Sequence, residues 1–279
     1  MANIDLSRIR SNIQGLNILH SLRTVNNELA THQLRLGTGQ RINSAGDDPA
    51  GMTIATKLRS RYRMLSAVYD NIGQAKNMMS VAEGGLLNMS DILVTMNEKL
   101  IAAASDSLGS EERNAIVRQL VQQVAELQDI AGQTEFNGVS LLDSAQSFNF
   151  QTGPDSQTVW QTSSFAPDAL GMVNMLALLE TDVIDSANYQ TYRDEVDAAM
   201  SAVSNGLTAI GSLMNRMTTK EDAISVARIN TEAAFSRIFN ADMAVEQMEV
   251  TKYTILQQTS LAMLAQANLN GQSLLMLFQ

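Results

Sequence analysis

The positions of proline constrain this chain more than any other feature. Only three prolines occur, at Pro49, Pro154 and Pro167, so residues 50–153 and 168–279 contain nothing that forbids long helices. Aromatic residues make up only 5% of the chain, whereas it has 16 methionines, and this balance favours helix packing over a β-sandwich core. We therefore expect a mainly α protein.

An apolar stripe begins near the N-terminus and predicts the first helix. Its members recur every three or four residues, which is the pattern of an amphipathic helix: Leu6, Ile9, Ile13, Leu16, Leu19, Leu22, Val25 and Leu29. The pattern ends at Leu36, and the two glycines Gly37 and Gly39 open a turn-rich stretch. Asp48 followed by Pro49 predicts the start of a second helix, because aspartate caps free amides and proline is tolerated at the first helical position.

The second helix is expected to run from Ala50 to about Ser105. At 1.5 Å per residue such a helix is on the order of 80 Å long, far longer than an ordinary globular helix. Ser110, followed by two glutamates, predicts the capped start of a third helix, which should fold back on the second. The spacing therefore predicts a rod of long antiparallel helices.

The middle of the chain loses the helical period. Phe148 and Phe150, then Val159 and Trp160, flank a turn centred on Pro154, which is the pattern of a β-hairpin. A helical pattern returns weakly over residues 172–179 and strongly from about Tyr189 to Phe278.

The domain organisation follows from these elements. We expect a terminal coiled coil from residues 1–36 and 241–279 and a linker loop at 37–48. A helical rod should comprise 49–142 and 190–240, and 143–189 should form a short central segment with the hairpin. Apolar helices at both termini could pair within the chain, but full burial of their stripes requires other copies.

Several classes of function find no support in the residues. The chain has no cysteine, and its net charge of −10 argues against a nucleic-acid partner. His20 and His32 lie about 120° apart on one helix and cannot share a metal ion. The sequence has no phosphate-binding loop and no nucleophile elbow. We expect no enzyme activity, no cofactor and no metal.

Membrane insertion and ordinary secretion are also not indicated. No run of about 18 apolar residues occurs, so we expect no membrane-spanning helix. Charged residues interrupt the N-terminal segment Met1–Arg23, which therefore lacks the apolar centre of a Sec signal peptide.

Three segments carry a family resemblance. Residues 34–51 contain the run Arg-Ile-Asn-Ser-Ala-Gly-Asp-Asp, residues 132–142 contain Gln-Thr-Glu-Phe-Asn-Gly, and residues 255–268 contain Ile-Leu-Gln-Gln-Thr. In position and order these segments closely resemble bacterial flagellins, over roughly residues 4–142 and 190–279. The resemblance implies an extracellular filament subunit that polymerises with its own copies.

The resemblance also implies roles for the segments defined above. The terminal helices should line the inner tube of the filament, the long middle helices should form an outer tube, and the loop 37–48 should act as a spoke between them. The implied spoke residues are Arg41, Ile42, Asn43, Asp47 and Asp48. The implied polymerisation interface comprises Leu6, Ile9, Ile13, Leu16, Leu22, Val25, Leu29, Val245, Met248, Ile255, Leu261, Leu264, Leu274, Leu275, Leu277 and Phe278.

Further implications concern partners. The family suggests export through the flagellar secretion apparatus without a cleaved signal, an export chaperone at the C-terminal helix, and contacts with the filament cap and the hook-filament junction proteins. Many flagellins carry two arginines on the second helix and an acidic residue on the third that an innate receptor binds. Here Thr95, Asn97 and Arg118 stand at those positions, so receptor recognition should be weak or absent.

Two alternatives remain open at the level of sequence. A hook-filament junction protein shares the same terminal pattern and would not extend into long filaments. A helical scaffold or ligand-binding bundle unrelated to flagella would instead form a well-ordered monomer.

Overall fold

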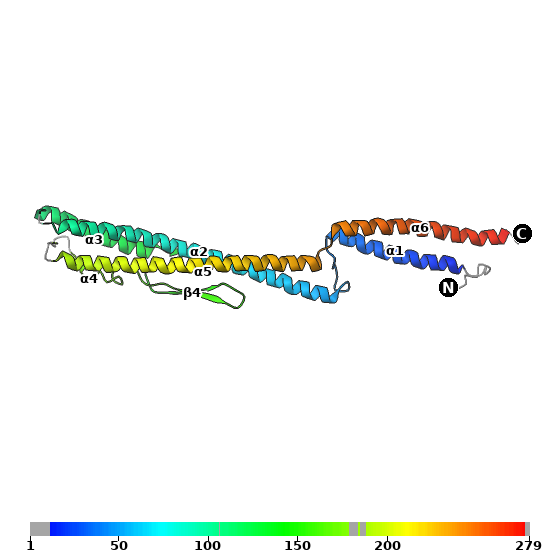
Figure 1. Ribbon diagram of the computed structural model, residues 1–279, viewed down its shortest axis with the longest axis horizontal. Helices are drawn as coiled ribbons and strands as arrows, with labels where there is room; N and C mark the ends of the chain where they lie inside the picture. The colour runs from blue at the N-terminus through cyan, green and yellow to red at the C-terminus, as the bar shows by residue number, and fades with distance from the viewer. Residues whose placement is uncertain (1–11, 106, 179–183, 185–187, 277–279) are drawn as a thin grey trace. The chain divides into compact units, whose positions relative to one another are not determined.

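The computed structural model describes residues 12–105, 107–178, 184 and 188–276, with side chains up to Leu269. Long helices dominate this part of the chain, and two small antiparallel hairpins lie between the third and fourth helices (Figure 1). The mainly α fold with long helices and a central β-hairpin is confirmed. The elements are α1 (Ile13–Thr38), α2 (Pro49–Ala103), α3 (Ser110–Gln133), β1 (Glu135–Phe136), β2 (Val139–Ser140), β3 (Ser147–Gln151), β4 (Gln157–Gln161), α4 (Val173–Leu176), α5 (Tyr189–Phe239) and α6 (Met243–Met276).

The chain divides into two compact units. Met1–Tyr62 and Asn230–Gln279 form the first, and Arg63–Ile229 forms the second. These divisions differ from the boundaries expected at residues 48 and 240, because α2 and α5 each contribute residues to both units. None of the described helices is long and apolar enough to cross a membrane.

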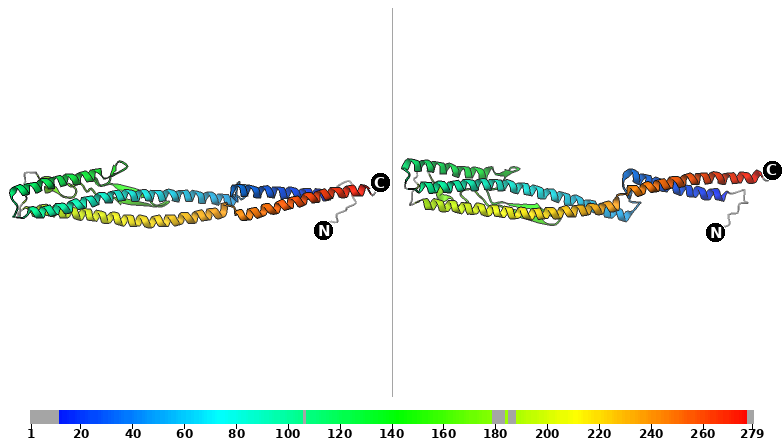
Figure 2. Two further views of the ribbon diagram at one scale, coloured as in Figure 1. Left: turned by 90° about the horizontal axis from the view of Figure 1, so that it is seen from above. Right: turned by 45° about the horizontal axis from the view of Figure 1, so that its top comes forward.

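A regular seam of buried residues runs along α2 in the second unit. Its members alternate spacings of three and four, which is the heptad pattern of coiled coils. We call this set the α2 seam: Leu65, Val68, Ile72, Ala75, Met79, Ala82, Leu86, Met89, Leu93, Met96, Leu100 and Ala103. A matching seam on α5 comprises Val196, Ala199, Val203, Ile210, Leu213 and Met217. Both views in Figure 2 show α2, α3 and α5 running alongside one another.

Polar contacts fix the register of α2 against α5. Lys76 Nζ lies 2.6 Å from Glu221 Oε2, and the Arg228 guanidinium lies 4.7 Å from the centre of the Tyr69 ring. The two contacts are seven residues apart on α2 and also seven residues apart on α5, but they occur in the reverse order along α5. The helices are therefore antiparallel, with the same heptad offset in both.

The central segment contributes to the core of the second unit. Its buried side chains join the same hydrophobic cluster as the helix seams: Trp160, Phe165, Leu170, Met172, Met175, Leu178 and Ile184. Glu195 on α5 helps to hold this segment, since its carboxylate accepts hydrogen bonds from the backbone amides of Asn174 and Met175 at 2.9–3.1 Å. The described part of the central segment, residues 143–178 with Ile184, thus packs into the bundle.

The predicted hairpin is present as β3 and β4, which pair Phe148 with Trp160 across the two strands. Lys220 Nζ on α5 donates to the Thr152 and Thr158 hydroxyls, both at 2.7 Å. A shorter hairpin, β1 with β2, was not predicted. Its turn consists of Asn137 and Gly138, both with positive φ (53° and 77°), which is the signature of a two-residue type I′ turn.

In the first unit, α1 and α6 pack as an antiparallel pair, so the predicted terminal coiled coil is confirmed for the described residues. The helix α1 continues to Thr38, two residues further than expected, and Gly39 ends it with φ of 69°. The predicted cap at Asp48 is confirmed, because its carboxylate accepts from the Gly51 amide at 2.8 Å.

The helical pattern that begins at Tyr189 is interrupted, which the periodicity did not show. The break falls at residues 240–242, where the Asp242 carboxylate caps α6 by accepting from the amides of Ala244 and Val245. Beside it, the Arg41 amide donates to the Phe239 carbonyl at 2.8 Å and the Ala241 amide to the Gly39 carbonyl at 2.9 Å. The two connecting segments of the first unit therefore run antiparallel and bind each other.

Candidate assembly surface on the terminal helices

The terminal helices α1 and α6 bury part of their apolar surface against each other. Leu29 is buried, and Leu22, Val25 and Leu264 are half-buried, while Ala267 near the end of α6 is 4% exposed. At the far end of the pair, the Asn12 amide donates to the Ala267 carbonyl at 3.2 Å. One side of the predicted polymerisation interface is therefore used within the chain to hold α1 against α6.

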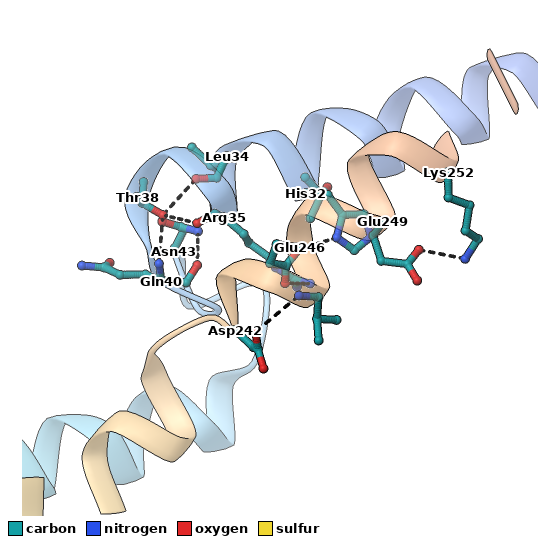
Figure 3. A network of polar contacts seen from close by, with 12 residues as sticks. His32, Leu34, Arg35, Thr38, Gln40, Asn43, Asp242, Glu246, Glu249 and Lys252 are labelled. Atoms are coloured by element: carbon teal, nitrogen blue, oxygen red, sulfur yellow. Dashed lines mark hydrogen bonds and ion pairs between the residues drawn. The ribbon is translucent and has the colours of Figure 1, made fainter. Parts of the chain in front are cut away.

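A polar cluster lies inside the same helix pair (Figure 3). His32 Nδ1 is 2.6 Å from Glu246 Oε2, and Arg35 approaches the other oxygen of that carboxylate at 3.9 Å. The His32 ring also stacks on Tyr253, with 5.3 Å between ring centres. The side chain of Glu246 is only 9% exposed, and a buried carboxylate is costly unless it is paired. The cluster therefore favours one register of α1 on α6.

A second charged pair sits at the edge of this cluster. Lys252 Nζ donates to Glu249 Oε2 at 2.8 Å. This hydrogen bond lowers the pKa of the Glu249 carboxyl and raises the pKa of the Lys252 ammonium. Both groups are solvent-accessible, so the pair contributes little to stability.

The predicted spoke residues lie in the connection between α1 and α2, where they serve different purposes. Ile42 is buried, and the exposed Arg41 takes part through its backbone amide. One oxygen of Asp47 accepts from the amides of Asn43 and Ser44, both at 2.9 Å. These bonds, the one from Ser44 first, hold the pKa of Asp47 below its ordinary value. The Asp47 side chain therefore stabilises the turn at residues 43–47 through hydrogen bonds within the loop.

Four exposed apolar residues also lie on the side of α6 that faces away from α1, with polar residues such as Lys252 and Thr259 between them. At about 100° per residue, Val245, Met248, Ile255 and Met263 fall within an arc of about 80°, centred about 130° from the positions that contact α1. They are between 46% and 64% exposed. We call these four residues the outer stripe. An amphipathic surface helix would carry few exposed apolar residues on this side, so the outer stripe is a candidate for burial against another molecule.

The other predicted interface residues divide between exposed and undescribed positions. Ile13 and Leu16 on α1 and Leu261 on α6 are each at least 50% exposed. Leu274 and Leu275 belong to the last turns of α6, of which only the backbone is described. Leu6, Ile9, Leu277 and Phe278 lie outside the described residues.

Thr95, Asn97 and Arg118, the three positions expected to match a receptor site, lie in the second unit. Thr95 donates to the carbonyl of Asp91 on its own helix, and Arg118 on α3 is exposed. The Asn97 amide donates to the Asp197 carboxylate on α5 at 2.7 Å. Asn97 therefore has a structural partner inside the bundle.

Sequence reasoning missed three contributors to this surface. Met263 was absent from the predicted interface, although it lies 15 residues from Met248 and hence on nearly the same side of α6. Glu246 and Tyr253 were also missed, since their roles depend on His32 of a distant helix. In the described part of the chain, no group of three or more His, Cys, Asp or Glu side chains is placed to hold a metal.

Comparison with known proteins identifies the family. Residues 9–147 match the model of the bacterial flagellin N-terminal helical region, and residues 194–278 match that of the C-terminal helical region. The chain is 32% identical to the flagellin of Halalkalibacterium halodurans over 272 residues, which cover 97% of this chain and 99% of that protein. It is 31% identical to the flagellin of Bacillus subtilis over 305 residues, which cover 98% of this chain and all of that protein.

A solved structure shares the fold. The flagellar hook-associated protein of Vibrio parahaemolyticus aligns with a TM-score of 0.61 at 16% identity, over 70% of this chain and 100% of that chain. At this identity the likeness concerns the fold alone. The two family models together match most of the chain, and the flagellins above match nearly all of it. The chain belongs to the bacterial flagellin family.

Proposed function

We propose that this chain assembles into the flagellar filament by burying the outer stripe of α6 against neighbouring copies of itself. As a flagellin it is a structural subunit of the bacterial flagellar filament, a polymer of flagellin copies. What the family alone does not specify is which side chains make the contact. The single observation that supports our choice is that four apolar residues of α6 remain about half exposed on a side of the helix that does not contact α1.

The size of the contribution supports this role. Full burial of a Val, Ile or Met side chain contributes about 1.5–3 kcal/mol. About half of the surface of each outer-stripe residue is still exposed, so burying the rest would contribute roughly 3–6 kcal/mol per subunit. The exposed Ile13 and Leu16 of α1 would add to this. Such a surface is a liability on a free monomer and an advantage in a polymer.

This contact suggests a position in the filament for each segment of the chain. Residues 1–36 and 241–279 would form the inner tube of the filament, with the C-terminal residues Leu274, Leu275, Leu277 and Phe278 extending the apolar surface. The helices of 49–142 and 190–240 would form the outer tube, and the loop 37–48 would be the spoke. The short central segment, packed into the bundle, would leave the filament with little outer decoration.

The route to the filament is also proposed. The subunit would leave the cell through the flagellar secretion apparatus without a cleaved signal. An export chaperone that covers the C-terminal helix would hide the apolar side of α6 until assembly. At the growing end, the filament cap and the hook-filament junction proteins would meet the same terminal helices. We propose no catalytic role, since the function of the family is structural.

Seeded growth of purified protein tests the assembly surface. Short filament fragments are mixed with free subunits carrying Ile255→Ser, and elongation is followed by light scattering and electron microscopy. We expect growth to slow or stop, while far-ultraviolet circular dichroism stays close to that of the wild-type protein. Val159→Ser, which changes a comparably exposed residue of β4, is the control and should elongate normally. Normal growth of the Ile255 variant would show that α6 uses another side.

A further inference from the structure

The described methionines of this chain range from fully buried to strongly exposed, with Met52, Met200 and Met214 in between. Seven are buried in the core of the second unit: Met78, Met79, Met89, Met96, Met172, Met175 and Met217. Four others are between 43% and 64% exposed: Met64 on α2, and Met243, Met248 and Met263 on α6. Thioether oxidation depends on access of the oxidant, so the two groups should differ strongly in reactivity.

Two of the exposed methionines stand out by position. Met248 and Met263 are 64% and 62% exposed, and both belong to the outer stripe. Met243 lies on the same helix but on another side, about 140° around the axis from Met248, and Met64 lies on a different helix. Among the methionines whose side chains the structure describes, only Met248 and Met263 therefore combine high exposure with the proposed assembly surface.

We propose that Met248 and Met263 form an oxidation site for hydrogen peroxide that controls whether a free subunit joins the filament. This inference rests on the proposed function of the outer stripe. In the reduced form the two side chains supply flexible apolar surface. In the oxidised form they place two polar sulfoxides at the contact.

The reaction balances without further reagents. The methionine sulfur attacks one oxygen of hydrogen peroxide, a sulfur–oxygen bond forms and the oxygen–oxygen bond breaks. The sulfur is oxidised by two electrons to the sulfoxide, and the second oxygen leaves as hydroxide, which takes up the remaining proton and becomes water. The product is polar and chiral in place of a flexible apolar thioether.

The physical consequence follows from the surroundings of the stripe. On this side of α6, Met248 and Met263 lie near the apolar Val245 and Ile255, and each also has a polar residue one turn away, Lys252 for Met248 and Thr259 for Met263. Lys252 Nζ already donates to Glu249 Oε2 at 2.8 Å, and a sulfoxide oxygen that enters the contact loses its water, so burial of the oxidised side chains is less favourable than burial of the thioethers. Oxidised subunits should therefore be excluded from growth.

Assembly should in turn protect the site. Once the outer stripe is covered by a neighbouring copy, peroxide no longer reaches the two sulfurs, and existing filaments should resist a dose that inactivates free subunits. The modification is also of a reversible class, because methionine sulfoxide reductases restore the thioether. The state of the free pool, rather than that of the filament, would then respond to oxidant.

The experiment uses the full chain in a seeded elongation assay with and without prior hydrogen peroxide treatment. Peptide mass spectrometry first maps oxidation in free subunits and in filaments. We expect rapid oxidation of Met248 and Met263 in the subunits, slow oxidation of both in filaments, and slow oxidation of the core residue Met89 in each. Treated wild-type subunits should elongate at least about tenfold more slowly, a factor that corresponds to about 1.4 kcal/mol.

Two matched pairs of Met→Leu variants test whether oxidation of Met248 and Met263 causes the slower elongation. Replacement of both sites, Met248→Leu with Met263→Leu, preserves apolar volume and should keep elongation unchanged after treatment. The pair Met64→Leu with Met243→Leu leaves the proposed site intact and should remain sensitive. The inference is overturned if the first pair is inactivated as strongly as the wild type, or if Met248 and Met263 react no faster than Met89. If untreated wild-type subunits do not elongate seeds, the proposed function itself fails.

Discussion

Replacing Gly206 by alanine should destabilise the helical bundle of the second unit, although alanine is the better helix former. Gly206 occupies a seam position of α5, between Val203 and Ile210 in the alternation of three and four. A Cβ built there would lie 2.6 Å from Phe165 Cζ and 3.3 Å from Leu86 Cδ1. The missing side chain thus makes room for the ring of Phe165, which the central segment inserts into the bundle.

The magnitude follows from two opposing effects. Alanine in place of glycine favours a helix by about 1 kcal/mol, whereas overpacking a core costs typically 1–3 kcal/mol. Phe165 is buried, and its backbone amide donates to the Leu142 carbonyl at 2.7 Å, so the ring has little freedom to retreat. We expect Gly206→Ala to lower the free energy of unfolding by about 1 kcal/mol.

Gly211 on the same helix provides the matched control. A Cβ there would meet no atom within 4 Å, so Gly211→Ala should raise the free energy of unfolding by about 1 kcal/mol. The two variants should therefore differ by roughly 2 kcal/mol, which corresponds to a separation in Tm of about 4–8 °C for a domain of 150–250 residues. Urea and thermal unfolding of the full chain by circular dichroism measure both. Equal stabilisation by the two substitutions would refute the packing of Phe165 on Gly206.

Four further predictions address the terminal unit and the receptor. Glu246→Ala should weaken the packing of α6 on α1 by about 2 kcal/mol, because His32 and Arg35 lose their buried partner. Faster hydrogen exchange of the amides in both helices would show this loss. The double variant with His32→Ala should be destabilised by less than the sum of the two single variants. The lowered pKa of Asp47 means that its contribution to loop stability is present above pH 4 and lost as the pH falls through the folded pKa. Amide exchange of Asn43 and Ser44 should accelerate in that acidic range, and Asp47→Asn should remove the transition. Deleting residues 274–279 should abolish seeded growth while leaving the second unit folded, so an unchanged filament yield would contradict the role of the C-terminal apolar residues. If Thr95, Asn97 and Arg118 stand where the family resemblance places receptor-binding residues, purified protein should activate reporter cells weakly, and strong activation would contradict that assignment.

Local patterns in the sequence were sufficient for much of the fold. The α2 helix was predictable because its apolar residues follow one period over more than fifty positions without a proline. Asp48 before Pro49 predicted the start of α2, and the aromatic residues on either side of Pro154 predicted the hairpin of β3 and β4. In each case the determining interactions lie within a few residues along the chain.

Features that depend on distant partners were not predictable in this way. The central segment packs on α5 because Gly206 has no side chain and leaves space for the ring of Phe165. In the sequence, Gly206 is only a glycine within a helical pattern. A segment boundary was expected between residues 240 and 241, but the helical period itself continues on either side of Asp242, and the backbone bonds to Gly39 and Arg41 that stabilise the break depend on partners distant in the sequence. The β1–β2 hairpin was missed although Asn137 and Gly138 carry a local signal that identifies such turns.

The candidate site shows the same division. The apolar residues of α6 were correctly expected to be numerous, but their partition into an inner side that contacts α1 and an outer stripe requires the structure. The apolar and the polar residues of α6 are both spread around the helix, so its sequence defines no preferred face, and Leu264 and Ile255 could not be told apart before the position of α1 was known.

The strict alternation of the α2 seam has a consequence for how this chain tolerates insertions and deletions. An ideal helix drifts by about 20° per heptad relative to a seven-residue repeat. Over roughly five heptads the drift would reach about 100°, so helices that keep the seam in contact must wind around each other with a left-handed twist. Loss or gain of one residue rotates everything beyond it by about 100°. Length changes within α2 should therefore be accepted in whole heptads, matched on α5, or not at all.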